Sequence, residues 1–164
     1  MDAFEALRTR RSCRQFSSRE VSRHDLEQIV DAGRLAASAR NVQPWEFVVV
    51  TDASVRKRIA ELADTGRFIA DATACIAVVC KDTKYYIEDG SAATQNLLVA
   101  ARALGLASCW VAGDKKPHAE PVAAFLAVPQ GYRLVALVAV GYPVAEIPGP
   151  AKRPLVDVIH WDKF

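Results

Sequence analysis

Residues 8–16 read Arg-Thr-Arg-Arg-Ser-Cys-Arg-Gln-Phe, a stretch that holds four arginines within seven positions. Guanidinium groups crowded in this way repel one another unless an anion lies among them, and their planar forks match phosphate oxygens two at a time. Ser12 adds a hydroxyl that can donate to a phosphate oxygen. The stretch therefore predicts a phosphate-binding segment, with a solvated basic face for nucleic acid as the alternative.

The overall composition favours a small phosphorylated ligand over nucleic acid. The 164 residues carry a formal net charge of only +2, with 51% hydrophobic and 24% charged residues, which is ordinary for one globular domain. A nucleic-acid binder is usually basic over a whole face. Here the basic residues gather near the N-terminus and at Lys152 and Arg153. We expect one domain over residues 1–164, with no nucleic-acid partner.

The cysteines and the apolar runs indicate the compartment. The four cysteines form no Cys-x-x-Cys pair and have no histidine at ligand spacing, so no metal site is expected. The first residues are charged and unlike a secretory signal, and no apolar run approaches the ~20 residues of a membrane span. We therefore expect a reduced, cytoplasmic protein with no membrane segment.

Hydrophobic periodicity and turn residues predict helices that alternate with strands. Ser22 is a candidate helix N-cap, and residues 38–44 are expected to form a polar loop. The tail over residues 147–153 is too rich in Pro and Gly for regular structure, so it should run extended over a surface. Residues 155–161 are expected to form a short strand or turn. Helices are expected after Ser22 to about residue 37, from residue 52 or 54 to about 64, and over residues 88–104 and 121–126. Strands are expected over residues 45–50, 73–80, 107–112 and 134–140.

These elements predict an α+β fold in three layers, with a central antiparallel or mixed sheet of four to five strands flanked by helices. The run 73–80 is continuously apolar, which is typical of a strand buried on both faces. Helix 88–104 is apolar nearly all round, so it should lie in the core or at an interface.

Several single residues carry weaker expectations. His24 and His118 are interpreted as surface residues, and Glu88 and Asp89 as acidic residues that complement the helix dipole. The cations around Cys13 should lower the pKa of its thiol. Trp45 is expected in the core rather than beside a ligand. Tyr85 and Tyr86 are expected either to line a cleft or to pack before the long helix.

Five segments, in order along the chain, resemble the signatures of the nitroreductase family of FMN-dependent oxidoreductases. Residues 10–16 resemble RRSxRxF, and residues 37–48 resemble PSSxNxQPWxFV. Similar matches cover the central dimer helix (92–106), the segment beside the flavin ring (109–113) and the C-terminal signature (152–155 with 160–161). Two departures are Ala37-Ser38-Ala39 in place of Pro-Ser-Ser, which removes one hydroxyl, and the absence of the insertion that often covers the cleft.

The resemblance implies a homodimer with two FMN molecules in clefts at the subunit interface and with exchanged C-terminal segments. Arg10, Arg11, Ser12 and Arg14 would hold the FMN phosphate, ribityl chain and pyrimidine edge, and Lys152 or Arg153 would close the phosphate site. Ser38, Ala39 and Asn41 would meet the ring system, with Asn41 supplied by the other subunit. The backbone of Val111, Ala112 and Gly113 would face the opposite side of the ring or its N5 atom.

The chemistry implied is hydride transfer from NAD(P)H to a nitroaromatic, quinone or similar acceptor by a ping-pong mechanism, with the flavin as the redox group. Arg14 is the candidate catalytic residue, because a fixed cation near N1 and O2 stabilises the negative charge of the reduced ring. Two alternatives remain: a specialised flavin enzyme with a dedicated substrate, such as a dehydrogenase, dehalogenase or flavin-fragmenting enzyme, or a flavin-binding electron-transfer module without turnover. A nucleic-acid binder is the least favoured.

Overall fold

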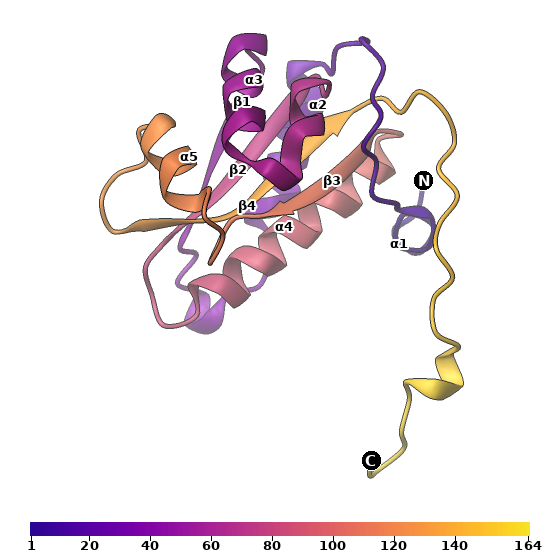
Figure 1. Ribbon diagram of the computed structural model, residues 1–164. Helices are drawn as coiled ribbons and strands as arrows, with labels where there is room; N and C mark the ends of the chain where they lie inside the picture. The colour runs from indigo at the N-terminus through magenta and orange to yellow at the C-terminus, as the bar shows by residue number, and fades with distance from the viewer.

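A computed structural model describes all residues 1–164 and shows three layers around one four-stranded sheet. The strands are β1 (Trp45–Val50), β2 (Ala74–Lys81), β3 (Ala107–Ala112) and β4 (Tyr132–Gly141). Their order is β1-β2-β4-β3, and every neighbouring pair is antiparallel (Figure 1). The expected α+β class and strand number are confirmed, and β1 and β3 are the two edges of the sheet.

The two central strands form the middle of the core. All residues of β2 from Ala74 to Cys80 are buried, as their continuous apolar character predicts. Because successive strand residues point to opposite faces, Ala77 and Val79 belong to one hydrophobic cluster and Ile76 and Val78 to the other. The sheet is thus covered on both faces even though it is antiparallel.

Helices α2 (Arg23–Arg34) and α4 (Tyr86–Ala103) cover one face of the sheet, where Trp45 is buried as expected. The Ser22 hydroxyl caps α2 by accepting from the amide of Asp25. The helix ends at Arg34, before the predicted residue 37, because the chain turns at Leu35. Asn96 Nδ2 donates to the carbonyl of Ala32 at 2.9 Å and ties the two helices together.

The opposite face is covered by α3 (Ala53–Leu62), the 3-10 segment η2 (Asp64–Ala70) and α5 (Ala119–Phe125). Asp52 caps α3, since its Oδ1 accepts from the amides of Ser54 and Val55. α5 begins two positions earlier than the sequence indicates, and it packs on β4 and α3.

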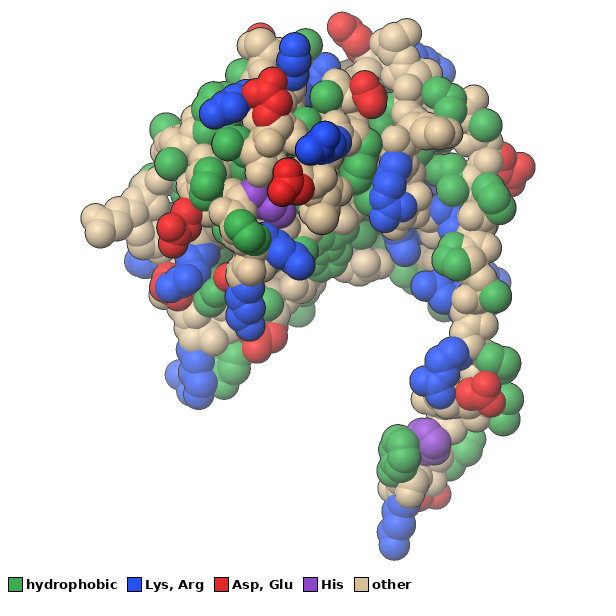
Figure 2. Space-filling view, viewed as in Figure 1, with side chains coloured by type: hydrophobic (Ala, Val, Ile, Leu, Met, Phe, Trp, Pro, Cys, Tyr) green, Lys and Arg blue, Asp and Glu red, His purple; other side chains and the backbone are tan.

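Helix α1 (Ala3–Thr9) packs on the C-terminal end of α4, whereas the C-terminal tail leaves the body. Residues 148–164 are exposed throughout, and their one regular feature is the 3-10 turn η3 (Leu155–Asp157). Figures 1 and 2 show the tail standing clear of the rest of the protomer. The predicted extended tail is present: its first residues lie on the body, where Ile147 packs against the core and Gly149 lies against Arg11, and the later residues stand clear of it. None of the helices combines the length and the apolar character needed to cross a membrane.

Candidate functional site

The arginine-rich segment after α1 contacts the free edge of β3 at Ser108 and then runs beside residues 142–144, which follow β4. Ser12 forms a parallel bridge with Ser108, and the amide of Cys13 donates to the Ser108 carbonyl at 3.0 Å. Further along, Phe16 bridges Pro143 and enters the core. Cys13 and Phe16 are buried, so the chain is held at these two points. The polar side chains between and before them are left at the surface.

No carboxylate pairs with the arginines of this segment. The ion pairs of the protomer involve Arg23, Arg34, Arg58, Arg67 and Arg133, all elsewhere. Arg11 donates through Nη1 to the carbonyls of Arg8 and Arg10, both at 2.8 Å, which turns its guanidinium back over the end of α1. Gly149 passes so close to this side chain that a Cβ would overlap it. The segment therefore presents positive charge without internal neutralisation.

Arg14 projects to the other side of the segment. Its guanidinium carbon lies 5.7 Å from the ring centroid of Phe68 in η2, within the range of a cation–π contact. Residues 12–15 and 144–148 line a common cleft there. The two faces of the segment thus differ: Arg10 and Arg11 lie toward α1 and α4, and Arg14 lies toward η2.

The edge of β3 presents alternate backbone groups. Gly113 N–H donates to the carbonyl of Val135 at 2.9 Å, toward β4, and the Ser108 carbonyl faces the outer edge. Because strand residues direct their backbone groups to alternate edges, the N–H of Ala112 points outward, whereas that of Val111 points toward β4. Ala112 is exposed, and Val111 and Gly113 are buried. Of the three, Ala112 is the residue whose amide faces open space.

His118 is buried rather than on the surface, and this expectation was wrong. Its Nε2 lies 2.8 Å from the carbonyl oxygen of Ala112. A carbonyl can only accept, so Nε2 carries the proton. Lys115 has a positive φ of 58°, and the turn there folds α5 back onto the end of β3. The imidazole therefore holds the peptide group between Ala112 and Gly113 in place, a contact that the polar character of the loop does not reveal.

Tyr86 and Asp114 connect the same turn to the beginning of α4. The Tyr86 hydroxyl donates to Asp114 Oδ1 at 2.7 Å, and the Arg133 guanidinium lies over the Tyr86 ring. Burial, followed by the hydrogen bond to the Asp114 carboxylate, raises the pKa of Tyr86 to about 12. The phenol stays protonated and continues to donate. Tyr86 therefore packs before the long helix and also lines a surface pocket with Asp114 and Arg133, while Tyr85 is exposed.

The loop over residues 38–43 is strained. Arg40, Asn41 and Gln43 all have positive φ values, of 54°, 56° and 51°. Such angles are uncommon for residues with a side chain and concentrate at functional sites. The 3-10 turn η1 (Ala39–Asn41) forms within the predicted loop, and Ser38 Oγ accepts from the Gln43 amide at 2.9 Å. Asn41 is exposed.

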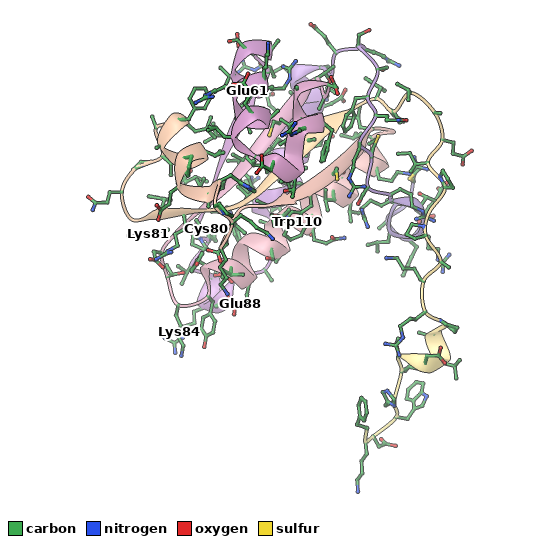
Figure 3. The ribbon with its side chains drawn as sticks, in the orientation of Figure 1. Glu61, Cys80, Lys81, Lys84, Glu88 and Trp110 are labelled. Carbon is green, nitrogen blue, oxygen red and sulfur yellow. The ribbon has the colours of Figure 1, made fainter.

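Asp89 anchors this loop and is more than a charge at a helix end. The amide of Ala39 donates to Asp89 Oδ1 at 2.8 Å, and Asp89 is 5% exposed. Glu88 beside it is exposed, as its interpretation as a dipole-complementing residue requires. Figure 3 shows Lys84 and Glu88 at the N-terminal end of α4. Trp110 of β3 packs against the hydrophobic cluster that includes α4. Asp89 lies in the first turn of α4, as the dipole-complementing interpretation expects, and in addition accepts the hydrogen bond of the loop.

The structure does not bring the two predicted groups of site residues together within one protomer. Asp89, next to Ala39, is in the first turn of α4, and Arg102, next to Thr9, is in the last. At about 1.5 Å per residue these two turns lie about 20 Å apart. Figure 1 shows η1 and α1 at opposite ends of the helix. Lys152 and Arg153 lie on the exposed tail, where Arg153 Nη2 donates to the Asp157 carbonyl.

The comparison with known proteins identifies the family. The sequence profile of the nitroreductase family matches residues 7–81 and 65–142. A protein of Archaeoglobus fulgidus, named as a candidate NADH dehydrogenase/NAD(P)H nitroreductase, is 37% identical over 153 residues, which is 88% of this chain and 87% of the relative.

The chain belongs to the nitroreductase family. It is an oxidoreductase of that family, so the family indicated by the sequence resemblance is confirmed.

Solved nitroreductase-family structures share the whole fold. A candidate NADH dehydrogenase/NAD(P)H nitroreductase of Parabacteroides distasonis has a TM-score of 0.92 and 30% identity, covering 99% of this chain and 98% of that one. An FMN-dependent nitroreductase of Clostridium difficile has a TM-score of 0.91 and 26% identity, covering 98% and 99%. The short chain length is therefore shared with other family members.

One further expectation about this nitroreductase-family site is wrong. Burial raises the pKa of the Cys13 thiol, and this effect exceeds the opposing influence of the Gln15 backbone and of the Arg14 charge. Cys13 is 1% exposed, and its Sγ lies 3.1 Å from the Gln15 carbonyl. The neighbouring cations point outward, so they do not compensate for the loss of water around the sulfur.

Proposed function

We propose that this nitroreductase-family protein is an FMN-dependent homodimer that transfers hydride from NAD(P)H to nitroaromatic, quinone or similar acceptors. The observation that carries the proposal is the run of arginines without carboxylate partners, which contacts the free edge of β3 at Ser108, the edge whose other end presents the amide of Ala112. Such a run can bind the phosphate of a ligand through charge-assisted hydrogen bonds. An exposed strand edge can form hydrogen bonds with the polar edge of a flat ring.

The donor set fits FMN chemically. Arg10 and Arg11 supply forked donors, Ser12 supplies an exposed hydroxyl, and the segment holds no competing acid. Ser108, which pairs with Ser12 through the backbone, has a buried hydroxyl without a partner. Buried polar atoms without partners are uncommon and often mark the place of a missing ligand or water.

When bound, FMN supplies the hydride chemistry, alternating between NAD(P)H and the acceptor in a ping-pong cycle. Arg14, whose guanidinium lies over the Phe68 ring, would place a positive charge at the pyrimidine edge of the flavin and would stabilise negative charge at N1 and O2. The amide of Ala112, whose own carbonyl bonds to His118, would donate toward N5. Lys152 or Arg153 closes the phosphate site from the tail.

We propose a dimer because a single protomer does not bring together all the residues of the proposed flavin site. Residues 38–41 are about 20 Å along α4 from the arginine segment, so a second copy must supply Ser38, Ala39 and Asn41 to the same ring. The tail exposes large apolar side chains that a lone protomer leaves in water, among them Leu155, Val156 and Trp161. An exposed apolar segment of this kind is typical of an interface.

Flavin titration and anaerobic reduction test the proposal. The purified protein should bind FMN, and NADH or NADPH should bleach the flavin absorbance within seconds, after which a quinone restores it. Arg10→Ala should weaken FMN binding by roughly ten- to hundredfold, as expected for lost charge-assisted bonds. Arg58→Ala, an exposed arginine on α3, is the matched control. Binding without bleaching by either nucleotide would indicate a passive flavin carrier instead.

A further inference from the structure

A cavity lies between the end of α1, the last turn of α4 and the start of β3. Three arginines line it: Arg10 and Arg11 from the segment after α1, and Arg102 from α4. Ser108 lines it from β3, and Glu146 is its one acidic residue. Arg102 belongs to none of the segments that resemble a phosphate-binding signature, since it lies in the last turn of the central helix.

Arg102 is held in place rather than free in solvent. Its Nε donates to the Thr9 hydroxyl at 2.9 Å, and Thr9 Oγ1 itself donates to the Glu5 carbonyl at 2.7 Å. The guanidinium is half-buried and has no carboxylate within ion-pair distance. With Nε occupied, its remaining N–H groups stay available to a ligand. An arginine fixed by one bond and open on its other side is preorganised for an anion.

Ser108 provides an independent observation. It is 1% exposed, and its Oγ has no hydrogen-bond partner. A buried hydroxyl without a partner costs free energy, so a ligand that accepts from it recovers that cost. The cavity is thus lined by three cations and one hydroxyl donor without a partner, and by a single exposed glutamate. Such a lining favours an anion with several acceptor oxygens.

We propose that Arg102 and Ser108 bind the phosphate of FMN in this cavity, together with Arg10 and Arg11. The inference rests on the proposed function and adds to it a cation and a hydroxyl from α4 and β3. Arg102 then contributes to the selection of FMN over riboflavin, which has the same ring and ribityl chain but no phosphate. α4 thereby contributes to the phosphate end of the site as well as to the core.

Paired titrations with FMN and riboflavin test the assignment. Arg102→Ala should weaken FMN binding by roughly ten- to hundredfold and leave riboflavin binding unchanged, because riboflavin lacks the recognised group. Arg102→Lys, which keeps the charge without the fork, should give an intermediate FMN affinity. Arg58→Ala should match the wild type for both flavins. Equal weakening of both ligands by Arg102→Ala, or no change in FMN affinity, would overturn the assignment while leaving the proposed function intact.

Ser108→Ala gives a second, independent readout. Removal of an unpartnered buried hydroxyl should leave the thermal midpoint of the apoprotein unchanged or raised, while FMN affinity falls by roughly three- to tenfold. A lowered midpoint with unchanged FMN affinity would show that the hydroxyl serves the fold. If the wild type binds neither flavin, the proposed function fails. Inorganic phosphate then tests the cavity alone: it should stabilise the wild type but not Arg102→Ala, and equal stabilisation of both would exclude the site.

Discussion

The backbone amide of Ala39 and the carboxylate of Asp89, 50 positions apart in sequence, are joined by a 2.8 Å hydrogen bond. This bond fixes the strained loop over residues 38–43 to the first turn of α4. The loop is one of the two groups of residues proposed to enclose the flavin, so in the proposed dimer the bond would couple the longest helix to the flavin site of the other subunit.

Asp89→Ala should destabilise the protein by about 1–3 kcal/mol, because the Ala39 amide loses its acceptor in a buried setting. Asp89→Asn keeps an acceptor oxygen and should lose much less. Urea unfolding measures the stability, and titration with FMN measures the effect on the site. Glu88→Ala, at the exposed neighbouring position, is the control, and an equal loss in that variant would argue against a specific bond.

The Tyr86 phenol should ionise at a higher pH than an ordinary tyrosine. Its pKa is raised from 10.0 to about 12, so the folded protein keeps the proton above the pH at which the unfolded chain releases it. The resulting stabilisation is fully present below pH 10 and is lost as the pH rises toward about 12. Absorbance at about 295 nm, where ionised tyrosine absorbs, should show one late tyrosine that disappears in Tyr86→Phe. Tyr85→Phe should retain it, and a spectrum that Tyr86→Phe leaves unaltered would contradict the assignment.

The four thiols should be unreactive in the folded protein. All four cysteines are buried and free, and burial raises the pKa of each thiol, in Cys75 and Cys80 to about 12. Since the thiolate is the reactive form, a disulfide reagent at pH 8 should modify none of them until denaturant exposes all four. Rapid modification of one thiol that Cys13→Ser abolishes would contradict the raised pKa of Cys13.

The C-terminal tail should drive association. Leu155 and Trp161 are 72% and 80% exposed in the protomer, and their joint replacement by Ala removes apolar area that only a partner can bury. The dimer dissociation constant should rise by at least about a hundredfold, since each large side chain contributes roughly 1.5–3 kcal/mol when buried. Sedimentation velocity over a dilution series measures this constant. Lys163→Ala is the control on the same tail, and a dimer insensitive to the double replacement would place the interface elsewhere.

Much of the fold was accessible from local patterns. The continuous apolar run before Lys81 predicted a strand buried on both faces, and the bounds of β1 and β3 match the expected residues. Ser22 capped its helix as expected. These features depend on neighbours in sequence, through side-chain alternation and hydrogen bonds that span three or four residues. The end of α2 and the start of α5 were displaced, because helix ends depend on the local turn.

The amino-acid sequence by itself determined the family, the class of fold and the presence of a dense cationic segment, because each of these resides in short runs of residues. Only the tertiary structure decided which side chains accompany that segment. It joined Arg102 to Thr9, Asp89 to Ala39 and His118 to Ala112 by hydrogen bonds. It also separated residues 38–41 from residues 10–14 by about the length of α4. Those relationships join residues that are distant in sequence or lie across a turn, and they depend on how the layers pack, which no local periodicity encodes.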